Sequence, residues 1–137
     1  MHQIISFLRF LEHPISKKSY FSAIKRLLSW LYLSRTRKEI IADFVPPAKL
    51  SLKKGLYGAS SNYYFGLSDY QEMGFLLHYL SPGDFFVDIG ANAGVYSVLA
   101  SKVCGAKSMA FEPIPETQEY LKRNLELNGI EGEVELI

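Results

Sequence analysis

A short loop holds the residues whose types and spacing are most suggestive of chemistry. Residues 88–94 have the sequence Asp-Ile-Gly-Ala-Asn-Ala-Gly. Gly90 permits a sharp turn and lets the backbone approach a ligand, because no Cβ stands in the way. Gly94 allows close packing where a helix starts, and the N–H groups of a helix start favour a negative group. Asp88, at the end of a strand, is placed to face the ammonium of a ligand, in the crevice where open α/β sheets bind theirs.

A second acidic residue, Glu112, follows 22 residues after Gly90. A carboxylate at the end of the next strand can accept hydrogen bonds from both ribose hydroxyls of a nucleoside. Pro113 turns the chain and offers an apolar surface to an adenine ring. The alternative is a plain turn with a solvated glutamate. On the first interpretation, replacing Glu112 weakens cofactor binding and hardly changes thermal stability.

The loop departs from the fingerprints of sites that bind nucleotide phosphates. A dinucleotide fingerprint has the form Gly-x-Gly-x-x-Gly, but Asn92 stands at its second glycine. That glycine lets a pyrophosphate approach, so Asn92 argues against NAD or FAD. No Gly-Lys-Ser/Thr follows the loop, which excludes a P-loop. A ligand with an amino-acid end fits Asp88 and the open helix start better.

Hydrophobic periodicity predicts the elements that position these residues. Helices are predicted over residues 1–12 and 19–42, and Pro46-Pro47 breaks the helical pattern. Residues 48–66 are predicted to form a β-hairpin whose second strand is the run 63–65, Tyr-Tyr-Phe.

The second half of the chain alternates strands and helices. Residues 85–89 form a nearly continuous apolar run, as in a strand buried on both faces of a parallel sheet. A β-α-β-α-β order is completed by a helix over 95–105, a strand over 108–111, a helix over 115–128 and a strand over 134–137. That order predicts an α/β fold with a Rossmann-like parallel sheet.

Three regions follow from these elements. Residues 1–47 are a basic helical N-terminal region, 48–66 the hairpin, and 67–137 the first half of a Rossmann-like domain. The last strand, 134–137, would present an unpaired edge, which folded proteins normally pair or cover. We therefore expect the sheet to be incomplete and the chain to be the N-terminal portion of a longer domain. We expect the chain alone to be poorly folded or to self-associate.

The composition is that of a globular protein. The 137 residues are 48% hydrophobic and 21% charged with a net charge of +1, which excludes a disordered polar chain and a strongly basic nucleic-acid arm. The charge is uneven, with +8 on residues 1–60 and −7 on residues 61–137. The single Cys104 forms no internal disulfide, which is typical of a cytoplasmic protein. No metal site is predicted, because the histidines are scattered.

Residues 19–38 have the pattern of a basic amphipathic helix with aromatic side chains. Such a helix can lie on an anionic membrane surface, and the alternative is that it packs on the domain or on a second subunit. No window reaches about 18 uncharged apolar residues, so no transmembrane span is predicted.

Three sequence motifs occur in the second half of the chain. They are Val-Asp-Ile-Gly-Ala-Asn-Ala-Gly-Val-Tyr-Ser (87–97), Ala-Phe-Glu-Pro (110–113) and Leu-x-x-Asn-x-x-x-Asn (121–128). They resemble the FkbM-type methyltransferases, members of the class I superfamily that depends on S-adenosylmethionine. The resemblance implies that Glu112 holds the ribose of this cofactor. It implies that the methionine end is held by Asp88, Gly90, Ala91, Asn92 and Gly94.

By the same resemblance, the protein is expected to be an O-methyltransferase acting on a hydroxyl of a sugar, glycan or polyketide. We also expect no nucleic-acid partner. Members of that family continue through a further strand that carries adenine contacts. These 137 residues contain no such strand, so the resemblance covers only the first half of the family's domain.

No catalytic residue is assigned. A hydroxyl acceptor is a poor nucleophile at pH 7 and usually needs a base or a metal to take its proton. Glu72 and His78 have suitable types, but Glu72 fits a helix cap and His78 a helix surface. Two alternatives stay open: a non-catalytic fragment or interaction module, and an NAD-dependent oxidoreductase, against which Asn92 counts.

Overall fold

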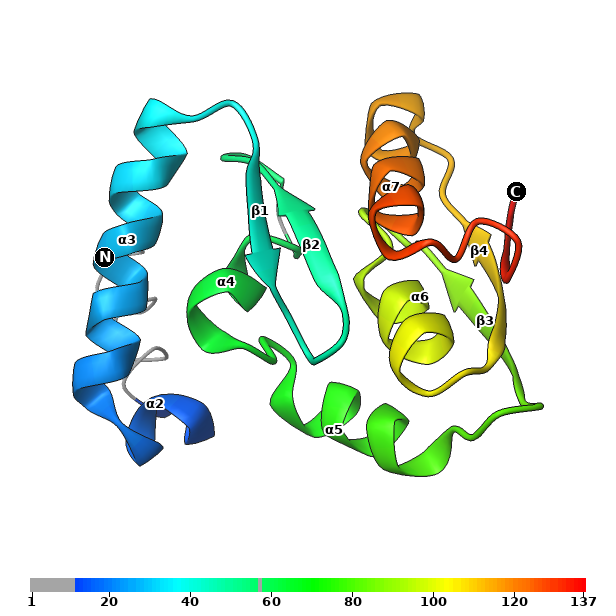
Figure 1. The fold of residues 1–137 in the computed structure, drawn as a ribbon, viewed down its shortest axis with the longest axis horizontal. Coiled ribbons are helices and arrows are strands. Elements are labelled where there is room, and N and C mark those ends of the chain that lie inside the picture. The colour runs from blue at the N-terminus through cyan, green and yellow to red at the C-terminus, as the bar shows by residue number, and fades with distance from the viewer. Residues whose placement is uncertain (1–11, 57) are drawn as a thin grey trace.

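The protein is described by a computed structural model over residues 12–56 and 58–137. Two helices open this part, α2 (Pro14–Lys18) and α3 (Tyr20–Thr36), and α3 flanks the rest of the chain on one side (Figure 1). Ser19 caps α3, because its Oγ accepts a hydrogen bond from Ser22 N at 3.4 Å. The helix predicted over residues 1–12 lies almost wholly outside the described residues.

The helix predicted over residues 19–42 is shorter than expected. It ends at Thr36, and β1 (Ile40–Asp43) follows. This strand pairs antiparallel with β2 (Lys49–Leu52), with Ile40 opposite Leu52. β-Branched residues favour strands, and here the pairing overrides the helical periodicity.

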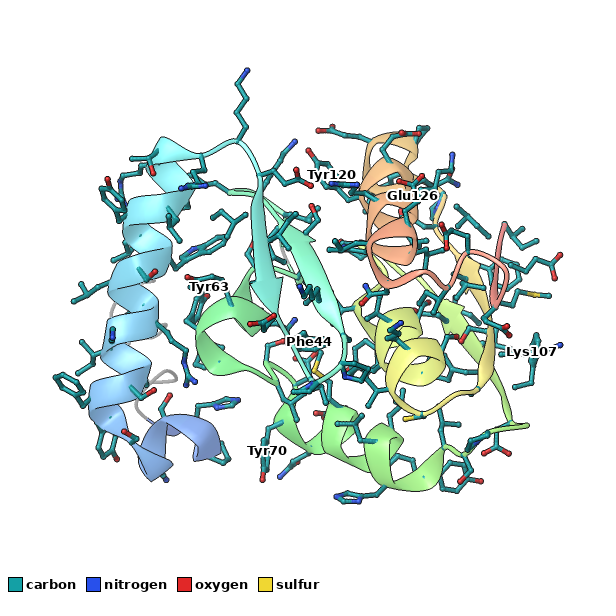
Figure 2. The ribbon with its side chains drawn as sticks, viewed as in Figure 1. Phe44, Tyr63, Tyr70, Lys107, Tyr120 and Glu126 are labelled. Carbon is teal, nitrogen blue, oxygen red and sulfur yellow. The ribbon has the colours of Figure 1, made fainter. Side chains whose placement is uncertain are left out.

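A hairpin is present, but the prediction that it spans residues 48–66 is wrong. Its strands are β1 and β2, with the cis Pro46–Pro47 peptide between them. The Tyr-Tyr-Phe run instead lies in the short helix α4 (Ser61–Phe65). Tyr63 lies between α3 and the hairpin (Figure 2), with its ring centroid 5.4 Å from that of Trp30. Tyr64 also packs against Trp30, so these two half-buried rings connect α4 to α3.

The main sheet is parallel, and its three strands lie in the order β3-β4-β5. The strands are β3 (Phe85–Ile89), β4 (Lys107–Phe111) and β5 (Val134–Leu136). The helices around them are α5 (Tyr70–Tyr79), α6 (Val95–Val98), which continues as the π-helical turn η1 (Leu99–Val103), and α7 (Pro115–Asn128). The predicted α/β fold with an incomplete Rossmann-like parallel sheet is confirmed.

Helices cover only one face of β3. Along the strand, Asp88 is buried and Phe86 half-buried, whereas Phe85, Val87 and Ile89 are exposed by 58%, 47% and 83%. Successive side chains of a strand point to opposite faces, so the exposed set shares the uncovered face. The prediction that this strand is buried on both faces is therefore wrong, because the described chain supplies one layer of helices.

The basic helix α3 exposes several large apolar side chains, including Phe21, Leu28 and Tyr32. Over the two described ranges, no helix is long and apolar enough to cross a membrane. Surface contact of residues 19–38 with a membrane stays a prediction.

The uncovered edge of β3 generates a prediction about self-association. Among the described strands β3 pairs only with β4, so its other edge offers free backbone groups beside exposed apolar side chains, a template for pairing with a second chain. We expect Val87→Lys to reduce the mass of the purified chain toward a monomer, measured by size-exclusion chromatography with light scattering.

The matched control is Leu28→Lys, at an exposed apolar residue of α3 far from this edge in the fold. It should leave the association unchanged. A wild-type chain that elutes as a monomer, or equal effects of the two changes, would contradict this role of the β3 edge.

Candidate functional site

The carboxyl end of β3 begins the site with a buried acid. Asp88 Oδ2 accepts hydrogen bonds from Ser97 N at 3.1 Å and from Ser97 Oγ at 2.7 Å. Burial raises the pKa of this carboxyl, the two Ser97 bonds oppose the rise, and the nearby charge of Glu112 adds to it. Asp88 therefore ties the strand end to α6 through one oxygen, and its Oδ1 is left as the atom that can face a ligand ammonium.

The loop after β3 is held by the end of β4. The N–H groups of Gly90 and Ala91 both donate to the carbonyl oxygen of Phe111, each at 2.9 Å. Asn92 N donates to Glu112 Oε2 at 2.8 Å. Three consecutive N–H groups of the loop thus donate to two consecutive residues, Phe111 and Glu112, at the end of β4.

The remaining N–H groups of the loop are also used inside the protein. Ala93 N donates to the Asn92 side chain, Oδ1, at 2.7 Å, and Gly94 N donates to Ala91 O at 2.8 Å. The N–H groups of residues 90–94 are therefore not available to a negative ligand. The expectation that the helix start favours a negative group stays a prediction for the first turn of α6. What the loop can offer a ligand is carbonyl oxygens, side chains and open backbone.

The two glycines of the loop, Gly90 and Gly94, have different surroundings. Gly94 has φ +77°, a conformation that favours glycine, and a Cβ there would lie 3.1 Å from Leu121 Cγ of α7, so that Leu121 would have to shift. Gly90 also has φ +77°, but no atom outside its own chain neighbours lies within 4 Å of its Cβ position. The open side of the loop is therefore at Gly90, where a ligand can contact the backbone. Asn92, at φ +51°, completes the turn with a side chain that tolerates this conformation.

Glu112 has a different environment from the one predicted. It is only 5% exposed, and its two oxygens accept from main-chain donors, Oε2 from Asn92 N and Oε1 from Ile114 N at 2.9 Å. It is thus not a solvated glutamate, and its carboxylate joins the loop to the start of α7. Each carboxylate oxygen can accept a second hydrogen bond, so contact with ribose hydroxyls remains a prediction.

Of the two residues that sequence reasoning considered for acid–base chemistry, Glu72 lines a cavity together with Val87 and Tyr96, and His78 does not line it. Glu72 and His78 are exposed on α5. The N-cap residue Asp69 makes no side-chain capping bond and instead accepts a hydrogen bond from Tyr96 Oη at 3.2 Å. In the part of the chain that the structure describes, no group of three or more His, Cys, Asp or Glu side chains is placed to hold a metal ion.

Sequence reasoning missed Ser97 as a partner of the site. It lies near the start of α6, three residues after Gly94, and is fully buried. The signal was a small hydroxyl residue inside an apolar helix, one turn beyond the loop, which is the position from which a hydroxyl reaches back to a strand end.

No protein-family model matches the chain. A protein-L-isoaspartate O-methyltransferase of Aeropyrum pernix is 40% identical over 58 residues, 41% of this chain and 22% of that protein. Methyltransferase sdnD of Sordaria araneosa is 46% identical over 50 residues, 36% of this chain and 19% of that protein. The chain therefore spans about a fifth of the length of these relatives.

Solved structures show the same kind of fold. A tRNA m1G37 methyltransferase of M. jannaschii matches with a TM-score of 0.57 and 25% identity, over 74% of this chain and 30% of that one. A Pyrococcus horikoshii protein described as a transferase matches with a TM-score of 0.59 and 21% identity, over 73% of this chain and 36% of that one. Both relatives and the M. jannaschii neighbour are named as methyltransferases. With TM-scores of 0.59 and 0.57, these two matches show a fold that the chain shares with the solved structures.

One prediction is contradicted by these methyltransferases. The sequence led us to expect a small-molecule or glycan hydroxyl acceptor and no nucleic-acid partner. The M. jannaschii neighbour is a tRNA methyltransferase, and another neighbour, at a TM-score of 0.56 and 24% identity, is Trm5 in complex with tRNALeu. We therefore withdraw that acceptor and the exclusion of nucleic acid.

The position of Glu112 corrects the expectation about its effect on stability. Glu112→Ala removes the acceptors of two main-chain N–H groups, and a buried unsatisfied donor costs about 1–3 kcal/mol. We expect the free energy of unfolding to fall by about 2 kcal/mol or more, measured by urea denaturation. The control is Glu131→Ala, at an exposed glutamate, which should change it by less than about 0.5 kcal/mol. Equal effects would mean that the bonds of Glu112 carry no net stability.

The raised pKa of Asp88 predicts a pH dependence. In the folded protein this carboxyl binds its proton more readily than in the unfolded chain, where its pKa is near 3.8. Its contribution to the free energy of unfolding therefore falls as pH rises from 3.8 through the raised folded-state pKa. Across urea titrations between about pH 4 and pH 7, wild-type stability minus that of Asp88→Asn should decrease as pH rises. A difference that stays constant or grows with pH would contradict this.

Proposed function

We propose that this chain forms the cofactor-binding first half of an S-adenosylmethionine-dependent methyltransferase. The observation that supports it most is that all five N–H groups of residues 90–94 donate inside the protein. A pyrophosphate needs free donors, whereas the ammonium of an amino-acid end needs acceptors. A loop that offers carbonyl oxygens beside the Asp88 carboxylate suits the ammonium. This contrast favours S-adenosylmethionine over NAD or FAD.

The proposed site uses residues on two neighbouring strand ends. Asp88 Oδ1 and the loop carbonyls receive the methionine ammonium, and the open side of Gly90 lets the cofactor lie against the backbone. The second lone pairs of the Glu112 carboxylate receive the ribose hydroxyls, with the carboxylate already oriented by Asn92 N and Ile114 N. The cofactor supplies a sulfonium methyl group for in-line displacement by an acceptor.

Within the class I superfamily, we further propose an FkbM-type lineage. The support is the resemblance of residues 87–97, 110–113 and 121–128 to the strings of that family. The relatives agree with the superfamily. The FkbM-type assignment itself rests on the three sequence motifs alone.

Calorimetric titration of the purified chain with S-adenosylhomocysteine, S-adenosylmethionine and NAD tests the proposal. We expect both adenosyl ligands to bind and NAD to bind more weakly. Gly90→Ala should weaken S-adenosylhomocysteine binding by roughly tenfold or more, because a Cβ then occupies the open side of the loop. The matched control is Gly83→Ala. Gly83 also has positive φ and open space at its Cβ position, but it lies in the turn before β3.

The two glycine changes impose the same kind of backbone strain, so stability alone does not separate them. A selective loss of affinity in Gly90→Ala supports the site. Tighter binding of NAD than of S-adenosylhomocysteine, no binding of either adenosyl ligand, or equal losses in the two variants would overturn the proposal.

A further inference from the structure

The edge of β2 that faces away from β1 is paired with side chains of α7. Asn128 Oδ1 accepts from Lys49 N at 2.8 Å, and Asn128 Nδ2 donates to Lys49 O at 2.8 Å. Asn124 repeats this on Ser51, with Oδ1 accepting from Ser51 N at 2.6 Å and Nδ2 donating to Ser51 O at 3.4 Å. Two side-chain amides thus take the place that a third strand would have in the hairpin sheet.

The spacing of the two asparagines explains why a helix can do this. Residues four apart on a helix are separated by about 6 Å along its axis, since each residue rises about 1.5 Å. Alternate residues of a strand, whose N–H and C=O groups point to the same side, are about 6.6 Å apart. The pair Asn124 and Asn128 therefore matches the pair Lys49 and Ser51.

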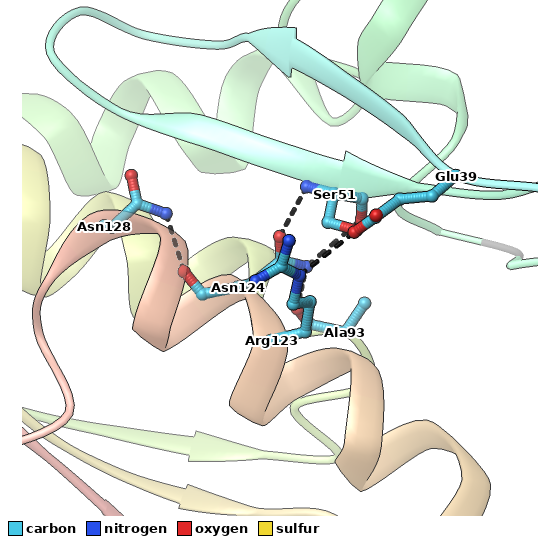
Figure 3. Close-up of polar contacts among 6 residues, drawn as sticks. All are labelled: Glu39, Ser51, Ala93, Arg123, Asn124 and Asn128. Carbon is cyan, nitrogen blue, oxygen red and sulfur yellow. Dashed lines mark hydrogen bonds and ion pairs between the residues drawn. The ribbon is translucent and has the colours of Figure 1, made fainter.

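Asn124 differs from Asn128 in a contact with the proposed cofactor loop. Its Nδ2 also donates to the carbonyl oxygen of Ala93 at 2.9 Å (Figure 3). The side chain is fully buried, and its amide bonds the hairpin on one side and the loop on the other. One turn earlier on α7, Leu121 lies against Gly94. Asn128 instead bonds to Lys49 and to Asn124 O within its own helix.

A surface ion pair also connects α7 with the residue that precedes the hairpin. Arg123 Nε donates to Glu39 Oε1 at 3.0 Å, and the same oxygen accepts from Ser51 Oγ at 2.6 Å. These donors hold the pKa of Glu39 below its ordinary value, with the Ser51 bond the larger cause. Both side chains of the pair are more than 40% exposed, so the pair contributes little to stability. The buried Asn124 amide is the contact that reaches the loop.

We propose that Asn124 is a positioning residue. By bonding both to β2 of the hairpin and to the 90–94 loop, it makes the affinity of that loop for its cofactor depend on the contact between the hairpin and α7. When β2 occupies the Oδ1 and one N–H of Asn124, the other N–H is aimed at Ala93 O. That bond fixes the orientation of the 93–94 peptide and, through Gly94 N to Ala91 O, the carbonyl of Ala91. The inference rests on the proposed function for its ligand, and on the hydrogen bonds for its geometry.

The test compares Asn124→Ala with Asn128→Ala. Each removes a bidentate side-chain contact with β2, so both should lower the melting temperature. Only Asn124→Ala should weaken S-adenosylhomocysteine binding. We expect a loss of roughly tenfold, because the hydrogen bond that orients Ala93 O is removed. Binding is measured by calorimetry at a temperature where circular dichroism shows each variant folded. Arg123→Ala, which removes only the surface pair, should leave the affinity unchanged.

A second measurement needs no cofactor. Hydrogen exchange of the amides of residues 91–94, followed by NMR, should be faster in Asn124→Ala than in wild type and unchanged in Asn128→Ala. If Asn124→Ala does not fold, Asn124→Ser gives the same comparison, because its hydroxyl is too short to reach both Ser51 and Ala93.

The outcomes separate the two proposals. If the wild type binds no S-adenosylhomocysteine, the proposed function fails, and hydrogen exchange still decides whether Asn124 positions the loop. Unchanged exchange in the Asn124 variant, or an equal loss of affinity in the Asn128 variant, overturns the positioning role.

Discussion

The constraint on which the site depends is the capture of three consecutive loop N–H groups by the end of β4. Gly90, Ala91 and Asn92 donate to the carbonyl of Phe111 and the carboxylate of Glu112. This requires the parallel register that sets Ile89 opposite Phe111, since these are the last paired residues of the two strands. A slip of one residue would turn the Glu112 side chain to the other face of the sheet. The buried donors would then lack acceptors, at a cost of about 1–3 kcal/mol each.

The same capture decides the chemistry that the loop can offer. A glycine-containing turn at a helix start is usually discussed as an anion site, because its N–H groups are free. Here the protein itself uses the N–H groups of residues 90–94, so the polar atoms that this loop leaves toward a ligand are mostly acceptors. The Glu112 carboxylate can therefore hold the loop and also contact a ribose. Its carboxylate holds the loop in place, and that same fixed orientation is what a ribose contact would need.

Helix α7 connects the loop to the rest of the chain. Its residues Leu121 and Asn124 contact the loop, and Asn124 and Asn128 pair with the edge of β2. A strand edge left open would be a site for unwanted pairing, and the two amides satisfy it instead. Among the described residues, nothing covers the second face of the main sheet at Val87 and Ile89, which are exposed. Parallel sheets are usually covered on both faces, and this chain matches about 30–36% of the length of its solved neighbours.

The sequence by itself determined the local features. The β-α-β-α-β order, the loop at residues 88–94, Pro115 at the start of α7 and Gly129 after its end depend on short-range periodicity and backbone preference, and all are present in the structure. Only the tertiary structure decided which strand pairs with β2, because alternation in residues 49–52 does not name a partner. Residues 63–65 are helical although their composition favours strands, and Tyr63 and Tyr64 pack against Trp30, a residue distant in the sequence. The direction of the Glu112 carboxylate and the exposure of β3 were likewise set by neighbours distant in the sequence. A strand-end glutamate and an apolar run have the same sequence whether those neighbours are present or absent.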